Sequence, residues 1–293
     1  MKNRLAFTML ELVFVIVIMG IIGKFGVEFF AQTYNNFIYS KINESLQAQS
    51  EMAVEIIAKR LQFRIKDSII RRKSSDNTFV SLANDTNYGD DYNILEYVGV
   101  DIDGFRGDLA PLWSGIIDLD LSSKTTLKSP ETNTTALNNL IQTLSHNSGT
   151  TVSDSALYFI GSDSDINNYG WDGNALTTQT NSVMHPIKAG DNLDEFNSSI
   201  AGVDFGGIDI YEYYQLAWSA YAFEHNPTTK ELFLYYDYQP WNGELFTSGQ
   251  KNLLMKNVST FRFKAVGSVV KIQVCVKSDL MEDYSLCKEK TIY

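Results

Sequence analysis

The strongest constraint on this chain is an apolar run near its N-terminus. From Phe7 to Gly23, only Thr8 and Glu11 interrupt the apolar side chains. Roughly 20 apolar residues cross the hydrocarbon core of a bilayer, so residues 7–30 are predicted to form a transmembrane helix. A carboxylate at the centre of a bilayer costs on the order of 2.5–3.5 kcal/mol by insertion scales, so Glu11 needs a partner.

The residues around this run predict its orientation. Lys2 and Arg4 precede it, and no acidic residue offsets them. The positive-inside rule therefore places the N-terminus in the cytoplasm and the rest of the chain outside. A secretory signal peptide would be cut after its apolar core at small residues, and "GIIGKFG" does not provide that pattern. A plain anchor explains the length of the run but leaves Glu11 unexplained.

The stretch "AFTMLELVFVIVIMGII" resembles the class III signal segment of type IV pilins and of type II secretion pseudopilins. In that family a prepilin peptidase cuts before the apolar helix and methylates the new N-terminus. The resemblance implies that residues 1–6 are a leader, that the cut falls between Ala6 and Phe7, and that Phe7 is N-methylated. Glu11 is then the acid at the fifth mature position. The family usually has Gly before the cut, where this chain has Ala6.

The resemblance also implies a function. The chain would be a minor pilin or pseudopilin, a structural subunit and not an enzyme, in a type II secretion, type IV pilus or DNA-uptake filament. Its size favours a low-abundance subunit of the J-type or W-like kind. Its partners would be other pilin or pseudopilin subunits, the prepilin peptidase, an inner-membrane assembly platform and the lipid bilayer. The anchor would lie in the bacterial inner membrane, with the C-terminal domain in the periplasm or a surface filament.

In such filaments the methylated amine is thought to meet the Glu of a neighbouring subunit, so Glu11 is predicted to act in filament assembly. A buried ammonium and a buried carboxylate become tolerable when they are paired. One rival interpretation is a membrane-anchored extracytoplasmic adhesion or binding module that uses a pilin-like leader. An anchored enzyme is a second rival, but the sequence contains no nucleophile elbow, phosphate-binding loop or dinucleotide fingerprint. We predict no cofactor.

Charge constrains the partners further. The formal net charge of −11 disfavours bulk attraction to nucleic acid, which stays a candidate partner only if the filament takes up DNA. Basic residues crowd one segment, and we expect this segment to pack near the acidic remainder: Lys59, Arg60, Arg64, Lys66, Arg71, Arg72 and Lys73.

The predicted fold class is α+β, with a long N-terminal helix packed on an antiparallel β-sheet domain that carries long loop insertions. Apolar residues recur mostly at four-residue steps after the span, so residues 31–73 are predicted to continue the helix with one apolar face. Residues 74–210 are rich in Ser, Thr, Asn, Asp and Gly and are predicted to be a loop-rich variable region. Residues 211–293 are predicted to form a β-sheet region with hairpins.

Cys275 and Cys287 are the only two cysteines, too few for a structural zinc site. Outside the cytoplasm they favour a disulfide. Alternating apolar residues from Val270 to Val276 predict a half-buried strand with Cys275 on its polar face, where a loop carrying Cys287 would cover it. This arrangement resembles the C-terminal disulfide loop of many type IV pilins.

Three further groups were considered as binding residues. Asp163, Asp165 and Asn167 alternate as calcium ligands do, but the loop lacks the glycine and terminal glutamate of a calcium site. We therefore interpret this stretch as a polar loop and keep its three residues as a weak calcium candidate. We predict no other metal site. The three histidines, at positions 146, 185 and 225, are interpreted as surface or turn residues. Tyrosines at 235, 236 and 238 with Trp241 form either an aromatic surface or ordinary strand packing.

Overall fold

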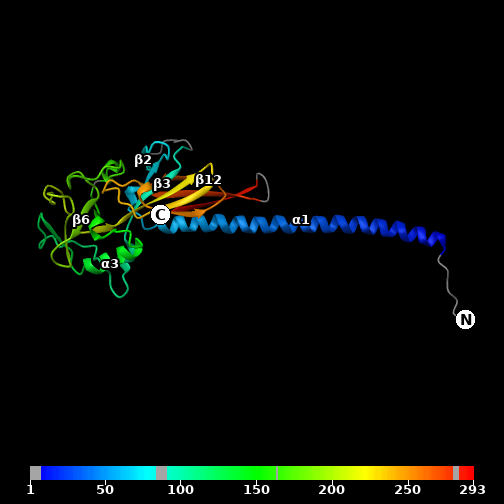
Figure 1. The fold of residues 1–293 in the computed structure, drawn as a ribbon, viewed down its shortest axis with the longest axis horizontal. Helices are drawn as coiled ribbons and strands as arrows, with labels where there is room; N and C mark the ends of the chain where they lie inside the picture. The colour runs from blue at the N-terminus through cyan, green and yellow to red at the C-terminus, as the bar shows by residue number, and fades with distance from the viewer. Residues whose placement is uncertain (1–7, 84–90, 163, 280–283) are drawn as a thin grey trace.

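The computed structural model describes residues 8–83, 91–162, 164–279 and 284–293, and it has the predicted α+β class. One long apolar N-terminal helix extends from a body built of antiparallel sheets (Figure 1). The helices are α1 (Met9–Leu61), α2 (Ile102–Arg106) and α3 (Thr134–Leu144), with 3-10 turns η1 (Lys66–Ser68), η2 (Val152–Asp154), η3 (Ile166–Tyr169) and η4 (Phe246–Ser248).

Within the described residues the strands form three sheets in which every pair is antiparallel. The first sheet has the order β11 (Gln250–Met255), β10 (Glu231–Tyr236), β9 (Ser219–Asn226), β3 (Ile94–Gly99), β1 (Ile70–Arg72) and β2 (Phe79–Ser81). The head sheet has the order β4 (Thr126–Lys128), β7 (Glu195–Ser198), β6 (His185–Ala189), β5 (Ala156–Phe159) and β8 (Tyr214–Ala217). The C-terminal sheet has the order β12 (Val258–Val266), β13 (Val269–Lys277) and β14 (Ser285–Ile292).

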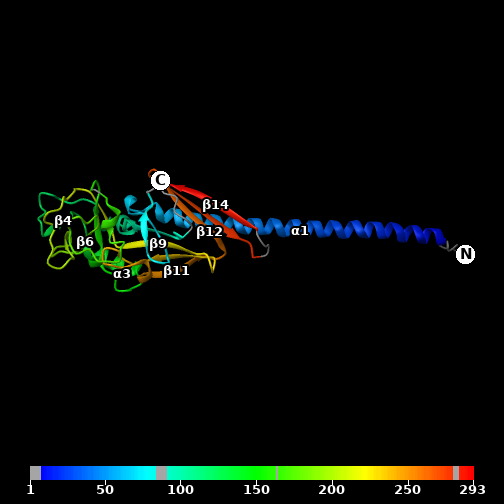
Figure 2. The same ribbon diagram turned by 90° about the horizontal axis from the view of Figure 1, so that it is seen from above.

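The two views place these parts along one axis. The head sheet and α3 lie at the end of the body away from the N-terminus, and the C-terminal sheet runs beside the second half of α1 (Figures 1 and 2). One core cluster joins α1 to the C-terminal sheet and to part of the first sheet. A second cluster lies between the first sheet and the head, and a third fills the head itself.

The helix ends earlier than predicted. α1 ends at Leu61, so the expectation that residues 31–73 are all helical is wrong for the last part of that range. Beyond Leu61 the chain pairs with the end of β3: the Ile65 amide donates to Val98 O at 2.9 Å, and the Val100 amide donates to Phe63 O at 2.8 Å. Ile65 and Ile69 continue the helical spacing in the sequence, but both have extended backbone conformations, and their side chains are buried in the body. Tertiary packing here overrides local helix propensity.

Residues 74–210 contain more regular structure than predicted. They include α3 and four of the five strands of the head sheet, with the fifth supplied by β8 just beyond them. The strands of the head sheet are three to five residues long, which is too short for their alternation to stand out among the polar loops. The sequence stretches 213–224 and 231–238 predict one hairpin, which is present as β9 and β10, but residues 214–217 form β8 of the head sheet instead.

The basic segment is tied to the body by a buried ion pair. Arg72 Nε lies 2.5 Å from Glu96 Oε1, and both side chains are at most 1% exposed. The other nitrogens of Arg72 donate to Asn77 O and Trp171 O, each at 2.8 Å. Burial raises the pKa of Glu96, while the Arg72 charge opposes that rise. The pair thus joins β1 to β3, and the bond to Trp171 O ties Arg72 to the connection between β5 and β6 of the head sheet. Breaking the pair would leave a buried charge uncompensated.

Burial shifts the pKa values of two titratable groups in and beside the head in opposite directions. Asp101 accepts hydrogen bonds from the Gly104 amide and Trp113 Nε1, both at 3.1 Å, and burial raises its pKa to about 6. His185 Nδ1 lies 3.0 Å from Gln179 Oε1, and burial lowers its pKa to about 4. The stability that protonated Asp101 contributes is lost as pH rises towards 6, whereas that of neutral His185 is lost as pH falls from 6.5 towards 4.

These two groups should therefore offset each other between pH 4 and 6.5, each contributing about 3 kcal/mol at most by linkage. Asp101→Asn should make the free energy of unfolding fall more steeply as pH falls through this window. His185→Gln should make it fall more steeply as pH rises. Urea unfolding of the full chain in detergent at several pH values measures both slopes. An unchanged slope in Asp101→Asn would contradict the assignment.

Candidate functional site

The two halves of α1 differ in what covers them. Every large apolar side chain between Met9 and Phe37 is exposed, and the helix in this half touches no sheet (Figure 1). From Ile42 onward the helix buries a single stripe against β13, β14 and β3: Ile42, Leu46, Ser50, Ala53, Val54, Ile57, Ala58 and Leu61. The second half is thus a packed element of the body, and the first half is an apolar surface that the described chain does not cover.

The exposed half is long and continuous. The 53 residues of α1 span about 80 Å at 1.5 Å per residue. Gly20, Gly23 and Gly26 lie within it, and the helical assignment runs through all three without a break. A Cβ added at any of them would meet nothing within 4 Å. α1 is the one helix in the described part of the chain that is long and apolar enough to cross a membrane.

Glu11 has a local partner at the start of α1. Thr8 is the N-cap residue: its amide donates to Glu11 Oε2 at 3.1 Å, and its hydroxyl donates to the same oxygen at 3.0 Å. In return the Glu11 amide donates to Thr8 Oγ1 at 3.4 Å. This is a capping box, which satisfies two amides that a helix start leaves unpaired and places a negative charge at the positive end of the helix dipole.

The capping role of Glu11 was absent from our sequence interpretation, although the sequence carries its signal. The tetrapeptide "TMLE" before the apolar run has the S/T-x-x-E pattern of a capping box. The predicted cleavage residues Ala6 and Phe7 lie outside the described residues. An ion pair lies farther along the exposed half, where Lys24 Nζ is 4.0 Å from Glu28 Oε1, with both side chains largely exposed.

The C-terminal strand fastens the second half of α1 to the body. Lys290 of β14 forms an ion pair with Glu55, and Lys288 Nζ lies 4.0 Å from Glu51 Oε2. Beside the strand, Tyr284 donates its hydroxyl hydrogen to Asn43 Oδ1 at 2.9 Å. Exposed ion pairs of this kind contribute little, about 0–1 kcal/mol each. The register of β14 follows from its pairing with β13, and the apolar stripe of α1 provides most of the stabilisation.

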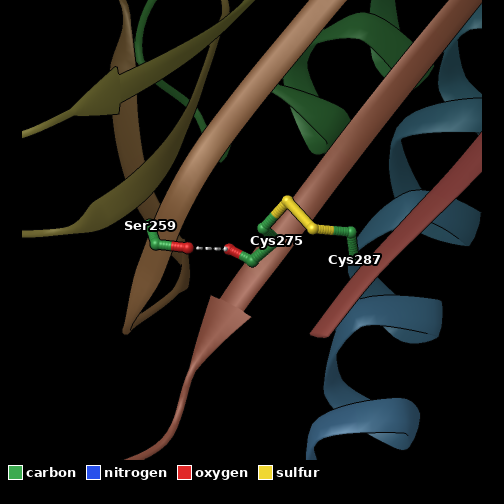
Figure 3. The surroundings of a disulfide bond; sticks show 3 residues. All are labelled: Ser259, Cys275 and Cys287. Atoms are coloured by element: carbon green, nitrogen blue, oxygen red, sulfur yellow. Dashed lines mark hydrogen bonds between the residues drawn. A yellow bond between two sulfur atoms is a disulfide. The ribbon is translucent and has the colours of Figure 1, made fainter. Parts of the chain in front are cut away.

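The predicted disulfide is present, but its surroundings differ from the prediction. Cys275 of β13 and Cys287 of β14 are direct register partners, so the bond joins two neighbouring strands (Figure 3). Cys287 therefore lies on a strand and not, as predicted, on a loop that covers Cys275. The main-chain oxygen of Cys275 accepts a hydrogen bond from the Ser259 hydroxyl of β12 at 3.3 Å. Cys275 is buried although the alternation of β13 places it on the polar face, and its side chain is bonded to Cys287 directly beside it on β14.

The other candidate residues have structural roles. Asp163 lies outside the described residues, and Asp165 caps η3 by accepting hydrogen bonds from the amide and side chain of Asn167. No group of three or more metal-binding side chains occurs among the residues described. The prediction of surface histidines is wrong for His185 and His225, which are both buried. Of the aromatic group, only Tyr236 is not fully buried, which favours strand packing over a binding surface.

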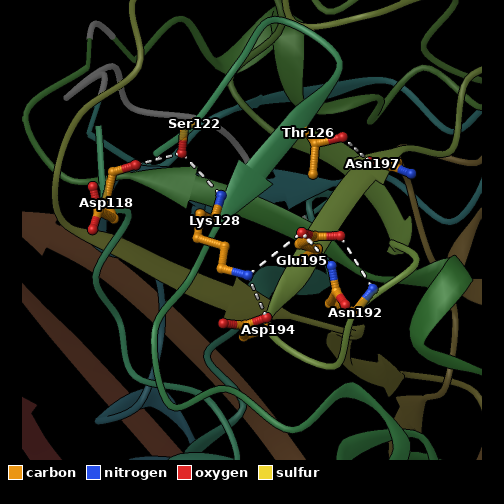
Figure 4. Close-up of polar contacts among 8 residues, drawn as sticks. All are labelled: Asp118, Ser122, Thr126, Lys128, Asn192, Asp194, Glu195 and Asn197. Atoms are coloured by element: carbon orange, nitrogen blue, oxygen red, sulfur yellow. Dashed lines mark hydrogen bonds and ion pairs between the residues drawn. The ribbon is translucent and has the colours of Figure 1, made fainter. Parts of the chain in front are cut away.

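The most connected polar cluster of the head is also structural. Lys128 Nζ of β4 lies 2.8 Å from Asp194 Oδ1 and 3.4 Å from Glu195 Oε1, on the turn and first residue of β7 (Figure 4). Asn192 donates to Glu195 through both its amide and its side chain. These contacts hold the β6–β7 turn against β4. Every charged group of the cluster is paired, so it offers no free ligand position.

Comparison of the chain with protein-family models, with curated proteins and with solved structures gives no match in any of the three. Its function must therefore be argued from its own residues.

The contribution of the disulfide to the stability of the body can be measured. Reduction, or replacement of both cysteines by serine, should lower the free energy of unfolding by roughly 3 kcal/mol, the value for a closed loop of about this length. Denaturant unfolding with and without reductant measures the difference, and the double serine variant should not respond to reductant. Free thiols at both positions on non-reducing peptide mapping would contradict the assignment.

Proposed function

We propose that this chain is a minor pilin or pseudopilin, a structural subunit that inserts into the filament of a type II secretion, type IV pilus or DNA-uptake machine. The observation that carries the proposal is the division of α1 into an exposed apolar half and a half packed on the body. An apolar helical surface of this length needs lipid or other helices to cover it. A filament subunit needs both, first in the membrane and then in the filament core.

The N-terminal sequence supports the same proposal. A prepilin peptidase would remove residues 1–6 and methylate Phe7, which leaves Thr8 as the second residue of the mature chain. Thr8 therefore stays in place to cap α1 after the cut. In the membrane precursor the N-terminus would lie in the cytoplasm and the body outside the inner membrane, as the residues Lys2 and Arg4 favour. The disulfide fits an extracytoplasmic body.

Processing can be measured directly. Intact-mass analysis of protein purified from membranes should show the loss of residues 1–6 and one added methyl group. The change Ala6→Gly should preserve the cut, since Gly is the usual residue there, and Ala6→Val should block it by its bulk. A chain that still begins at Met1 in cells with an active prepilin peptidase would contradict the proposal.

Glu11 then has two separable roles. It caps its own helix through Thr8, and it would attract the amine of Phe7 on a neighbouring subunit during assembly. Glutamine can replace glutamate in a capping box, so Glu11→Gln keeps the cap and removes only the charge. Thr8→Val removes the capping hydroxyl and keeps the charge. The two variants therefore distinguish local helix capping from attraction between subunits.

Glu11→Gln should reduce recovery of the protein in filaments by more than tenfold, because an unpaired buried charge costs about 3–5 kcal/mol. Thr8→Val should have a much smaller effect, about that of losing one cap, near 1 kcal/mol. Glu28→Gln is the matched control, since it removes an acid from the same helix. Quantitative blotting of sheared or cross-linked filaments from cells that carry the native machine provides the measurement.

A second candidate function is a membrane-anchored extracytoplasmic adhesion or binding module with a pilin-like leader. The observation in its favour is the head sheet, which has its own core of Trp113, Phe159, Phe196, Tyr214 and their neighbours. Such a module would keep its function when Glu11 is neutralised. Two results together would favour this alternative. The Glu11→Gln variant would show wild-type adhesion or binding at wild-type abundance, and the wild-type chain would be absent from filament preparations.

A further inference from the structure

Three large, mostly apolar side chains form a row on the outside of the head, here called the outer row: Ile116, Tyr213 and Ile160. They are 41%, 54% and 50% exposed. Ile116 and Tyr213 are direct bridge partners. The register of β5 with β8 extends by one residue to Ile160 and Tyr213, where the Ile160 amide donates to Tyr213 O at 2.9 Å. Directly opposite residues on antiparallel strands share a face, so the three side chains are neighbours across three strands.

The outer row is exposed because the core lies on the other face of the same strands. The chain neighbours Ile117, Tyr214 and Phe159 point the opposite way and are buried in the third core cluster. Residues 116–118 pair with the residue before β8 on one side and with β4 on the other, so the head sheet closes on itself. The outer row therefore lies on the outside of a closed sheet and not on a free edge.

The head that carries the outer row is strongly acidic. Residues 101–217 contain 16 Asp and Glu against four Lys and Arg, a formal charge of −12, so the rest of the chain carries +1 of the net −11. Three of these four cations are paired or stacked elsewhere in the body, and they are Lys124, Lys128 and Arg106. Most acids of the head therefore have no cation to neutralise them.

Three of these acids flank the outer row. Asp118 lies two residues beyond the row on the same face, and its carboxylate points away from the ammonium of Lys128 on the paired strand (Figure 4). Glu212 is exposed beside Tyr213, and Asp120 is exposed in the turn that follows Asp118. None of the three acids forms an ion pair with a described cation. The outer row is thus an apolar surface with a negative rim.

The surroundings of the outer row indicate what covers it. A bilayer that holds the exposed half of α1 lies at the other end of the body, so it does not reach the head (Figures 1 and 2). Exposed apolar surface with a polar rim is typical of protein interaction sites, and the negative rim favours a cationic partner. We propose that the outer row docks a partner protein that presents an apolar patch flanked by Lys and Arg. The proposal is independent of the filament function.

A short basic helix is the matched probe. Neighbouring strands lie about 4.7–4.9 Å apart, so the outer row is about 10 Å wide, and helix side chains at i, i+4 and i+7 follow one another at about 5–6 Å. The probe is a dye-labelled helical peptide of Ala and Lys with leucines at these three positions. One control peptide has Glu in place of every Lys, and the other has Gln in place of every Leu. Fluorescence anisotropy with the full chain in a non-ionic detergent measures binding, and detergent alone is the blank.

The wild-type chain should bind the probe at least about tenfold more tightly than it binds either control peptide. Tyr213→Ser should weaken binding of the probe by about tenfold, because an aromatic side chain at the centre of an interface carries much of the affinity. Asp118→Asn should weaken it by about twofold to fivefold, the range for an exposed charge. The matched controls are Leu253→Ser, an exposed apolar residue of β11, and Glu44→Gln, an exposed acid of α1, and both should bind as wild type does.

Thermal unfolding without peptide checks that each variant folds, and Ile116→Ser on the neighbouring strand should weaken binding as Tyr213→Ser does, which keeps the test decisive if one of them fails to fold. Equal binding of the probe and either control peptide would overturn the proposal. So would equal binding by the outer-row variants and Leu253→Ser, or no binding by wild type. Sedimentation of the wild-type chain alone tests the other occupant. Self-association that Tyr213→Ser abolishes would assign the outer row to a second copy of this chain and overturn the proposal.

Discussion

The packing of residues 42–61 of α1 on β13 and β14 is the interaction on which the rest of the structure depends. It joins the first third of the chain to its last strand, and the apolar stripe of α1 becomes part of the main core. The ion pairs of β14 with Glu51 and Glu55 lie along the same contact, and the disulfide joins β13 to β14 on the opposite face of their sheet. Since the helix is rigid, fixing its second half also fixes where its exposed first half points.

That geometry gives the two ends of the molecule different surroundings. The exposed half of α1 extends from one end of the body, and the head lies at the other (Figures 1 and 2). Apolar surface without a partner is stable only where lipid or other helices cover it, so the N-terminal end must meet such surroundings. The head has a separate core and buried polar contacts of its own, so it can present surface loops without disturbing the helix contact.

The sequence allowed some of this to be predicted, for reasons that differ between elements. The apolar run, the alternation of β13 and the hairpin turn between β9 and β10 are strong local patterns, and the structure contains all three features. The end of α1 was missed because Ile65 and Ile69 keep helical spacing while long-range pairing with β3 draws them into extended backbone. The head sheet was missed because its strands are short and are separated by long polar connections.

In this interpretation lipid or other helices cover the first half of α1, while the second half is packed on the body. Single-cysteine labelling with a membrane-impermeant maleimide tests this in cells, with the native disulfide left intact. Val17→Cys lies in the exposed apolar half, and Ser45→Cys lies on the solvent side of the packed half. We expect Ser45→Cys to react in the membrane-bound protein and Val17→Cys to react only after detergent unfolding. Equal and rapid labelling of both positions in intact membranes would contradict it.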